Sequence, residues 1–205
     1  MSILNVFIAP DRALIGVDTE AMLPDGTTHQ VCKLVTVPHL GLGAGFRGVD
    51  MLFATVCPAI IAFKGAFDEL AQAMPGNIAV AEAFCREQFG FTNEDLAFNL
   101  VIAGYSESER KMVGHAYFRW PDGTSVKHEY GFPQFMGPEV TQDQLARLDI
   151  EPDQAGMKIL ALHQFEQMRK NEPDQAAGGR FFIAEARRNS IRIEQAFEFP
   201  PRHGE

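Results

Sequence analysis

Three glycines in the first quarter of the chain have the spacing of a nucleotide-binding turn. Gly43, Gly45 and Gly48 form a G-x-G-x-x-G pattern between an apolar, strand-like run and a helix-like run. In a dinucleotide-binding fold this turn follows the first strand, and an acidic residue ends an apolar strand about 20 residues later. Asp68 has that separation from Gly48, but it lies in a helix-like segment, and at least two strand-like runs precede the glycines. The surrounding sequence therefore argues against a dinucleotide site, and we expect no cofactor.

A lysine within an apolar run is the second feature with chemical meaning. Lys33 lies in the strand-like segment VCKLVTV. Because alternate residues of a strand share a face, Lys33 points inward when Cys32 and Leu34 face away. A lysine is rarely buried without a partner, and Asp18, in the apolar run ALIGVDT, is a candidate partner. The two residues form either a structural ion pair or part of a reactive site.

Length and charge exclude several classes of protein. The chain has 205 residues, 46% of them hydrophobic, and a net charge of −9. This length supports one domain with a substantial core, so we expect a single domain over 1–205. The acidic balance and the lack of a Lys/Arg cluster argue against a nucleic-acid partner.

The sequence carries no metal, disulfide or membrane signal. Its three cysteines are odd in number and widely spaced, and its six histidines lack the spacing of metal ligands. No apolar run is long enough to cross a membrane, and the N-terminus lacks the features of a signal peptide. We therefore expect a cytoplasmic protein without a metal site or a membrane partner.

Strands and helices are expected in blocks. Strand-like runs are followed by two helices, the first interrupted near Pro58, then by strands, one long helix and a closing hairpin. This order favours packed layers with antiparallel sheets over a doubly wound parallel sheet. The expected strands lie at 2–9, 13–19, 31–37, 40–46, 96–106, 111–132 (a hairpin) and 180–199 (a hairpin), and the expected helices at 48–74, 77–89 and 152–171.

The order of these elements resembles the proteasome-type family of N-terminal nucleophile hydrolases, which includes proteasome β subunits and the bacterial two-ring ATP-dependent peptidase. Ser2 opens the first strand, where that family has its nucleophilic threonine. Asp18 follows at the family spacing, and Lys33 stands in the third strand. The segment AGFRGVD, which contains Gly45, is similar to the family's turn after this strand. EPDQAAGG is similar to the family's DxxSGG loop, with Asp174 as its acid.

The resemblance implies an α+β fold, a four-layer αββα sandwich of two mainly antiparallel sheets, and hydrolysis of peptide or other amide bonds. Ser2, freed by removal of Met1, would attack the carbonyl while its own α-amine takes the proton. Lys33 would lower the pKa of the hydroxyl, and Asp18 would hold Lys33 in place. Gly45 would donate its N–H to the oxyanion, and Asp174 would orient the α-amine.

The resemblance also implies a homo-oligomer, with a ring as one form, and leaves open whether an ATP-dependent unfoldase is a partner. Departures from the family pattern support a second hypothesis. Ala177 replaces the serine of the DxxSGG loop, the segment GFPQFMG lacks a helper serine, and Met1 precedes Ser2. The second hypothesis is a catalytically silent subunit with a structural, assembly or binding role. A third is an amidase that acts on small molecules.

Overall fold

The computed structural model describes residues 2–22, 27–122, 126–138, 140–171 and 178–200. In chain order the elements are β1 (Leu4–Ala9), β2 (Arg12–Asp18), β3 (Glu20–Met22), β4 (Thr28–Gln30), β5 (Leu34–Val37), the 3-10 turn η1 (Pro38–Leu40), β6 (Leu42–Gly48), α1 (Asp50–Ile61), α2 (Phe67–Phe89), β7 (Phe98–Ser106), β8 (Lys111–Arg119), β9 (Lys127–Tyr130), β10 (Gln134–Gly137), α3 (Gln142–Leu148), α4 (Gln154–Asn171), β11 (Arg180–Arg187) and β12 (Ser190–Glu198).

The strands form two large sheets and one short hairpin. One sheet has the order β10-β1-β2-β11-β12, the other has the order β5-β6-β7-β8-β9, and β3 pairs with β4. Every strand pairing within the described residues is antiparallel. The expected mixture of helices and mainly antiparallel sheets is therefore confirmed.

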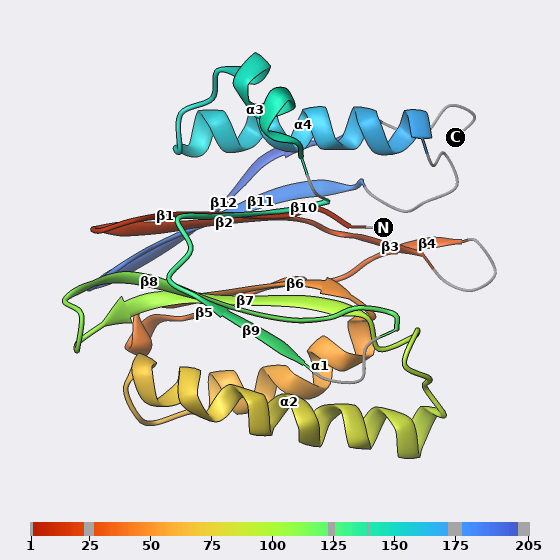
Figure 1. Cartoon of the computed structure of the whole chain (residues 1–205), viewed down its shortest axis with the longest axis vertical. Coiled ribbons are helices and arrows are strands. Elements are labelled where there is room, and N and C mark those ends of the chain that lie inside the picture. Colours follow the sequence, from red (N-terminus) through yellow and green to blue (C-terminus); the bar gives the residue numbers. More distant parts are fainter. Residues whose placement is uncertain (1, 23–26, 123–125, 139, 172–177, 201–205) are drawn as a thin grey trace.

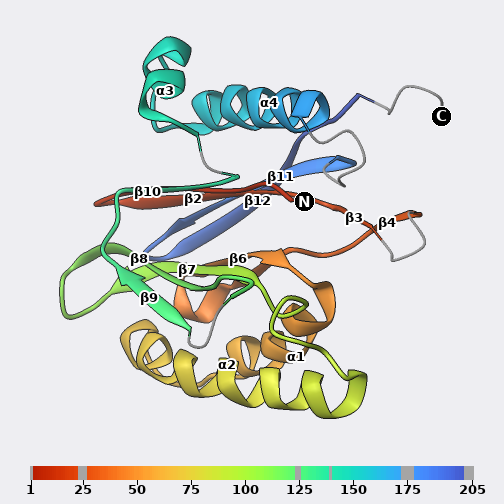
Figure 2. The ribbon, with the colours of Figure 1, turned by 45° about the vertical axis from the view of Figure 1, so that its right-hand side comes forward.

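Helices cover the outer faces of both sheets. Figures 1 and 2 show α3 and α4 above the sheet that contains β1 and β2, and α1 and α2 below the sheet that contains β6 and β7. One apolar cluster fills the space between the two sheets, and the other two pack each sheet against its helices. The inner faces of the two sheets thus meet in an apolar core.

The helices differ from the sequence expectation at their prolines. The expected break near Pro58 is wrong, because α1 runs through it to Ile61, and the segment from Phe67 continues through Pro75 as one helix. A proline at position 75 cannot donate an N–H to the carbonyl of Ala71 four residues earlier. The hydroxyl of Tyr117 donates to that carbonyl at 2.8 Å instead. The tertiary contact therefore satisfies the acceptor that the proline leaves free.

Two further differences concern short elements near the ends of the sheets. The strand expected at 31–37 begins only at Leu34, and the loop-like stretch before it contains the β3–β4 hairpin. A short helix, α3, precedes α4, and Thr141 caps it by accepting the N–H of Gln144 at 3.2 Å. Both features depend on pairing and capping over a few residues, which hydrophobic periodicity does not report.

Two buried polar pairs tie helices to the sheets. Arg119 of β8 donates to the carboxylate of Glu82 on α2 at 2.7 and 2.5 Å. On the other side of the molecule, the amide of Asn5 in β1 donates to Gln164 of α4 at 2.7 Å. Each pair satisfies groups that would be costly to bury alone, so each fixes how its helix lies on its sheet.

Glycine is required at a point where the two sheets pack closely. A Cβ atom at Gly45 of β6 would lie 2.6 Å from Cδ1 of Leu4 and 2.7 Å from Cγ2 of Ile15. Both neighbours belong to the facing sheet and are fully buried. The glycine pattern of the sequence therefore serves sheet packing here.

Gly45→Ala is expected to destabilise the protein by about 1–3 kcal/mol, because the added methyl group overpacks the core between the sheets. Urea-induced unfolding measures this loss. Gly76→Ala is the matched control, since nothing lies within 4 Å of its Cβ position in α2. That substitution is expected to stabilise the helix by about 0.8–1 kcal/mol. Equal stability of Gly45→Ala and the parent protein would contradict the packing account.

Candidate active site

The antiparallel pairing of β1 and β2 brings the start of the chain to the end of β2. Leu4 lies opposite Val17 in this pairing. The Ile3 N–H donates to Oδ1 of Asp18 at 2.8 Å, and the Asp18 N–H donates to the carbonyl of Ile3 at 3.3 Å. Ser2 and Asp18 are therefore neighbours because of strand register, although they are far apart in the sequence.

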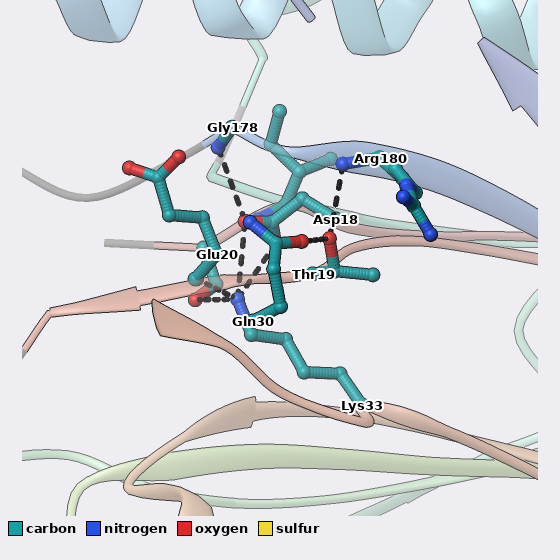
Figure 3. A network of polar contacts seen from close by, with 9 residues as sticks. Asp18, Thr19, Glu20, Gln30, Lys33, Gly178 and Arg180 are labelled. Atoms are coloured by element: carbon teal, nitrogen blue, oxygen red, sulfur yellow. Dashed lines mark hydrogen bonds and ion pairs between the residues drawn. The ribbon is translucent and has the colours of Figure 1, made fainter. Parts of the chain in front are cut away.

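Lys33 reaches this point from the segment that leads into β5. Its Nζ donates to Oγ of Ser2 at 2.8 Å and to Oδ1 and Oδ2 of Asp18 at 3.1 and 3.0 Å. It also donates to the backbone carbonyl of Glu20, just past β2. Figure 3 shows the Lys33 side chain extending up toward Asp18 and Glu20. The ammonium thus links the three predicted residues Ser2, Asp18 and Lys33.

These three residues are withdrawn from solvent. The exposed fractions are 9% for Ser2, 0% for Asp18 and 4% for Lys33. Desolvating an ion pair is costly unless its remaining hydrogen-bonding groups are satisfied. The contacts of Nζ with a hydroxyl, a carboxylate and a carbonyl meet that requirement.

The carboxylate of Asp18 is held by backbone donors as well as by Lys33. Burial raises the pKa of Asp18, while the Lys33 ammonium and the backbone N–H groups of Ile3 and Gly178 act to lower it. The Gly178 N–H lies 3.3 Å from Oδ2. Neither Gly178 nor the Glu20 carbonyl was predicted as part of the site. Every residue has a backbone carbonyl and every residue except proline has a backbone N–H, so residue type gives little signal for such contacts.

A second layer of contacts holds the segments that carry the cluster. Thr19 accepts the N–H of Arg180 through its hydroxyl at 2.9 Å, and the same hydroxyl donates to the side-chain carbonyl of Gln30. The Val31 N–H donates to the carbonyl of Thr19 at 2.7 Å. Figure 3 shows Thr19 between Gln30 and Arg180. The end of β2 is therefore tied to both the start of β11 and the segment before Lys33.

Gly45 does not contact this cluster. It lies within β6, opposite Leu34 of β5 and Val101 of β7. The N–H of Phe46 donates to the carbonyl of Lys33 at 2.9 Å. Since backbone N–H groups alternate in direction along a strand, the N–H of Gly45 faces β7. Its predicted role as an oxyanion donor stays a prediction.

The last predicted site residue belongs to the loop between α4 and β11. Asp174 lies outside the described residues, as do Met1 and Ala177. Gly178 begins the next described segment, and its contact with Asp18 shows that the end of this loop meets the cluster. The proposed action of Asp174 on the α-amine stays a prediction.

A pocket of about 430 Å³ adjoins Lys33. It lies between the end of the first sheet and the segment before β5, and Ser2 and Asp18 are not among the residues that line it. The lining residues are Val17, Thr19, Gln30, Val31, Cys32, Lys33, Leu34, Arg180, Phe182 and Ile193. Lys33 therefore stands between the buried cluster and an open space of a size typical of ligand sites.

Histidines and carboxylates do not gather into a metal site within the described part of the chain. No group of three or more His, Cys, Asp or Glu side chains there is arranged to hold a metal ion. His115 of β8 and His128 of β9 do lie together, with Nδ1 and Nε2 3.0 Å apart. Burial is the main cause that lowers the pKa of His115 to about 4, and the neighbouring His128 is the second cause.

Among the described helices, none is long and apolar enough to span a membrane.

By fold, the chain is a mixed α/β protein built on two facing, mainly antiparallel sheets, with a buried Ser–Lys–Asp cluster at one end of β1 and β2. No family model and no curated protein sequence matches the chain. Solved structures do match it over nearly its whole length.

Anbu proteins from three bacteria are among the similar structures. An Anbu mutant from Hyphomicrobium sp. strain MC1 has a TM-score of 0.67 at 13% identity, covering 96% of this chain and 87% of that one. Anbu from Yersinia bercovieri, described as an ancestral β-subunit, gives 0.63 at 10% identity, covering 97% and 88%. The helical assembly of the Anbu complex from Pseudomonas aeruginosa gives 0.67 at 12% identity, covering 96% and 87%. At these identities the similarity shows the fold, and the proteasome-like fold inferred from the sequence is confirmed at that level.

Lys33→Met is expected to lower the free energy of unfolding by about 3–5 kcal/mol at neutral pH, because Asp18 is left as an uncompensated buried charge. Without the ammonium, the already raised pKa of Asp18 rises further. A carboxyl whose pKa is higher in the folded protein than in the unfolded chain stabilises the folded protein at acidic pH. That stabilisation is lost as the pH rises through the folded pKa. The stability deficit should therefore grow as the pH rises from the unfolded pKa of about 3.9 to neutral.

Urea-induced unfolding of the parent protein and the variant across this pH range measures the deficit. Lys158→Met is the matched control, since Lys158 forms a surface ion pair with Glu194 at 3.7 Å. A surface pair of this kind is worth about 0–1 kcal/mol. A Lys33→Met deficit that does not change with pH would rule out an ionised, Lys33-compensated Asp18.

Proposed function

We propose that this chain is a proteasome-like N-terminal nucleophile hydrolase that cleaves peptide or other amide bonds, with Ser2 as the nucleophile. The observation that carries the proposal is the 2.8 Å contact between Oγ of Ser2 and Nζ of Lys33. A buried lysine that is neutralised by a buried aspartate and also bonded to a hydroxyl has the features of an activated nucleophile. The two partners lie just before two separate strands, Ser2 before β1 and Lys33 before β5.

The proposed reaction begins with Ser2 as the first residue. Its hydroxyl oxygen attacks the amide carbonyl and forms a C–O bond, and the free α-amine accepts the hydroxyl proton. An α-amine has an ordinary pKa of about 7.7–8.0, which suits a base near neutral pH. The proton then passes to the leaving amine as the C–N bond breaks, and water hydrolyses the acyl ester to restore the hydroxyl.

Lys33 and Asp18 act on this step through charge and position. The Lys33 ammonium stabilises the developing oxygen charge on Ser2 and donates a hydrogen bond to that oxygen. Asp18 keeps the ammonium charged and directed at Oγ, with both carboxylate oxygens within 3.1 Å of Nζ. Gly45 as oxyanion donor and Asp174 as partner of the α-amine belong to the proposal on the family resemblance alone.

The proposal extends to architecture and assembly. We assign the chain to the αββα sandwich as one domain over 1–205, located in the cytoplasm, and we expect it to form a homo-oligomer. The arrangement of helices on the outer faces of both sheets supports the first assignment. The structurally similar protein from Pseudomonas aeruginosa is described as a helical assembly, which supports self-association as an expectation for this chain.

A catalytically silent subunit is the second candidate function, and the burial of Ser2 favours it. Ser2 is 9% exposed and does not line the pocket beside Lys33. A retained Met1 would also convert the α-amine to an amide and remove the base. In this case the Ser–Lys–Asp cluster serves only to hold the ends of three segments together.

Treatment with a peptide α′,β′-epoxyketone separates the two candidates, because this electrophile reacts with both a hydroxyl and a free α-amine on the same residue. The parent protein is expected to begin at Ser2 and to gain one covalent adduct there, measured by intact mass and peptide mapping. Ser2→Ala should gain none, and Ser2→Thr should retain the adduct. Ser190→Ala, at the exposed hairpin between β11 and β12, is the matched control and should react normally.

Two outcomes would contradict the hydrolase proposal. One is a purified chain that retains Met1 and forms no adduct, which would favour the silent subunit. The other is an adduct of undiminished yield on Ser2→Ala, which would place the reactive group elsewhere.

Lys33→Met is expected to form the adduct at least about 100-fold more slowly than the parent protein, because the electrostatic stabilisation by the ammonium is lost.

A further inference from the structure

The pocket beside Lys33 has an apolar wall that the proposed reaction does not use. Val17 of β2 and Phe182 of β11 are paired across neighbouring strands, and Ile193 lies on the adjoining strand β12. Leu34 of β5 and Val31 contribute from the opposite side. The pocket therefore separates the ends of the two large sheets and offers an apolar slot between them.

Most polar groups of the pocket are already engaged within the protein. The three protons of the Lys33 ammonium face Ser2, Asp18 and the carbonyl of Glu20. The hydroxyl of Thr19 donates to Gln30 and accepts from a backbone N–H. A ligand would gain little by competing for these groups, since each protein contact that it displaced would have to be replaced.

Arg180 is the exception. Its backbone N–H bonds to Thr19, but its guanidinium has no ion-pair or hydrogen-bond partner among the residues that the structure describes. Figure 3 shows the guanidinium turned away from the Asp18–Lys33 cluster, with the Glu20 carboxylate on the opposite side of Asp18. An arginine fork at the edge of an apolar pocket suits a carboxylate, which it can bind through two parallel hydrogen bonds.

We propose that this pocket binds an apolar chain that carries a carboxylate, with the chain between the two sheets and the carboxylate on Arg180. The volume of about 430 Å³ lies within the range of small-molecule sites. The binding site stands whether or not Ser2 is a nucleophile, because none of its contacts requires Ser2. Its occupant would lie against Lys33, so binding also affects the access of ligands to that residue.

Octanoate is the probe, because it combines one carboxylate with an unbranched apolar chain. Calorimetric titration of the full chain is expected to show one site. Octanol, which has the same chain without the charge, should bind more weakly. Failure of octanoate to bind the folded parent protein would overturn the proposal.

Two variants test the two halves of the site. Arg180→Gln is expected to weaken octanoate roughly fivefold, the value of one exposed ion pair, and to leave octanol unchanged. Ile193→Asp should weaken both ligands by roughly tenfold or more, because it places a charge in the apolar wall. Octanoate affinity that is unchanged in both variants would overturn the assignment to this pocket.

Each variant has a matched control. Arg192→Gln is the control for Arg180→Gln. It removes an exposed arginine on β12 whose guanidinium lies 3.2 Å from Glu194. Ile159→Asp is the control for Ile193→Asp and changes an isoleucine of α4 that is 48% exposed. Neither residue lines the pocket, and neither change should alter octanoate binding. Thermal unfolding confirms that each variant is folded before titration.

Cys32 provides a second readout that does not depend on substitution. It is exposed and lines the pocket, whereas Cys57 is partly buried and does not line it. Saturating octanoate is expected to slow alkylation of Cys32 by iodoacetamide at least threefold and to leave Cys57 unchanged. Equal alkylation of Cys32 with and without bound octanoate would place the ligand elsewhere.

The carboxylate ligand has two natural sources, which a parallel titration distinguishes. A free acid is represented by octanoate, and the carboxyl end of a peptide by N-acetyl-leucyl-leucine. Tighter binding of the peptide, lost in Arg180→Gln, would identify a peptide subsite beside Lys33. Tighter binding of octanoate would identify a site for a free acid.

Discussion

The buried ammonium of Lys33 is the constraint around which this structure is arranged. An ammonium that is 4% exposed persists only if nearby groups replace its lost hydration. Asp18 supplies the compensating charge, and Ser2 and the Glu20 carbonyl supply the remaining acceptors. These acceptors lie just before β1, at the end of β2 and at the start of β3, so Lys33 joins three segments of the chain. The same contacts that compensate the buried ammonium also place the Ser2 hydroxyl beside its positive charge.

The surrounding backbone makes this arrangement rigid. Asp18 receives the N–H groups of Ile3 and Gly178 in addition to the lysine, so its carboxylate is held from the first strand and from the loop before β11. Thr19 then joins the same two regions to the segment before Lys33. Beside the cluster the two sheets pack closely, since a Cβ at Gly45 would lie 2.6 Å from Cδ1 of Leu4. Preorganisation of this kind is what electrostatic catalysis requires, since the groups need not reorganise during the reaction.

Much of this could be predicted from residue types and spacing, and the rest depends on contacts that residue types do not encode. Lys33 in an apolar run and Asp18 in another could be recognised as a buried pair because an unpaired buried lysine is costly. The blocks of strands and helices predicted an α+β fold with antiparallel sheets. The path of α2 through Pro75 could not be predicted, because it depends on the hydroxyl of Tyr117, distant in sequence. Gly45 was assigned from its motif, yet strand alternation turns its N–H toward β7, and the pocket at Arg180 arises where two separate sheets end.

The most direct test of the central claim is a double-mutant cycle on the rate at which Ser2 reacts with the epoxyketone. The cycle compares Asp18→Asn, Lys33→Met and the double variant with the parent protein. If Asp18 acts on Ser2 only through Lys33, each single variant should be about as slow as the double variant, because groups that act as one unit are strongly non-additive. Two results would contradict an activated Ser2 held by the buried pair. One is that the effects of the two substitutions on the activation free energy add in the double variant. The other is that all three variants react at the parent rate.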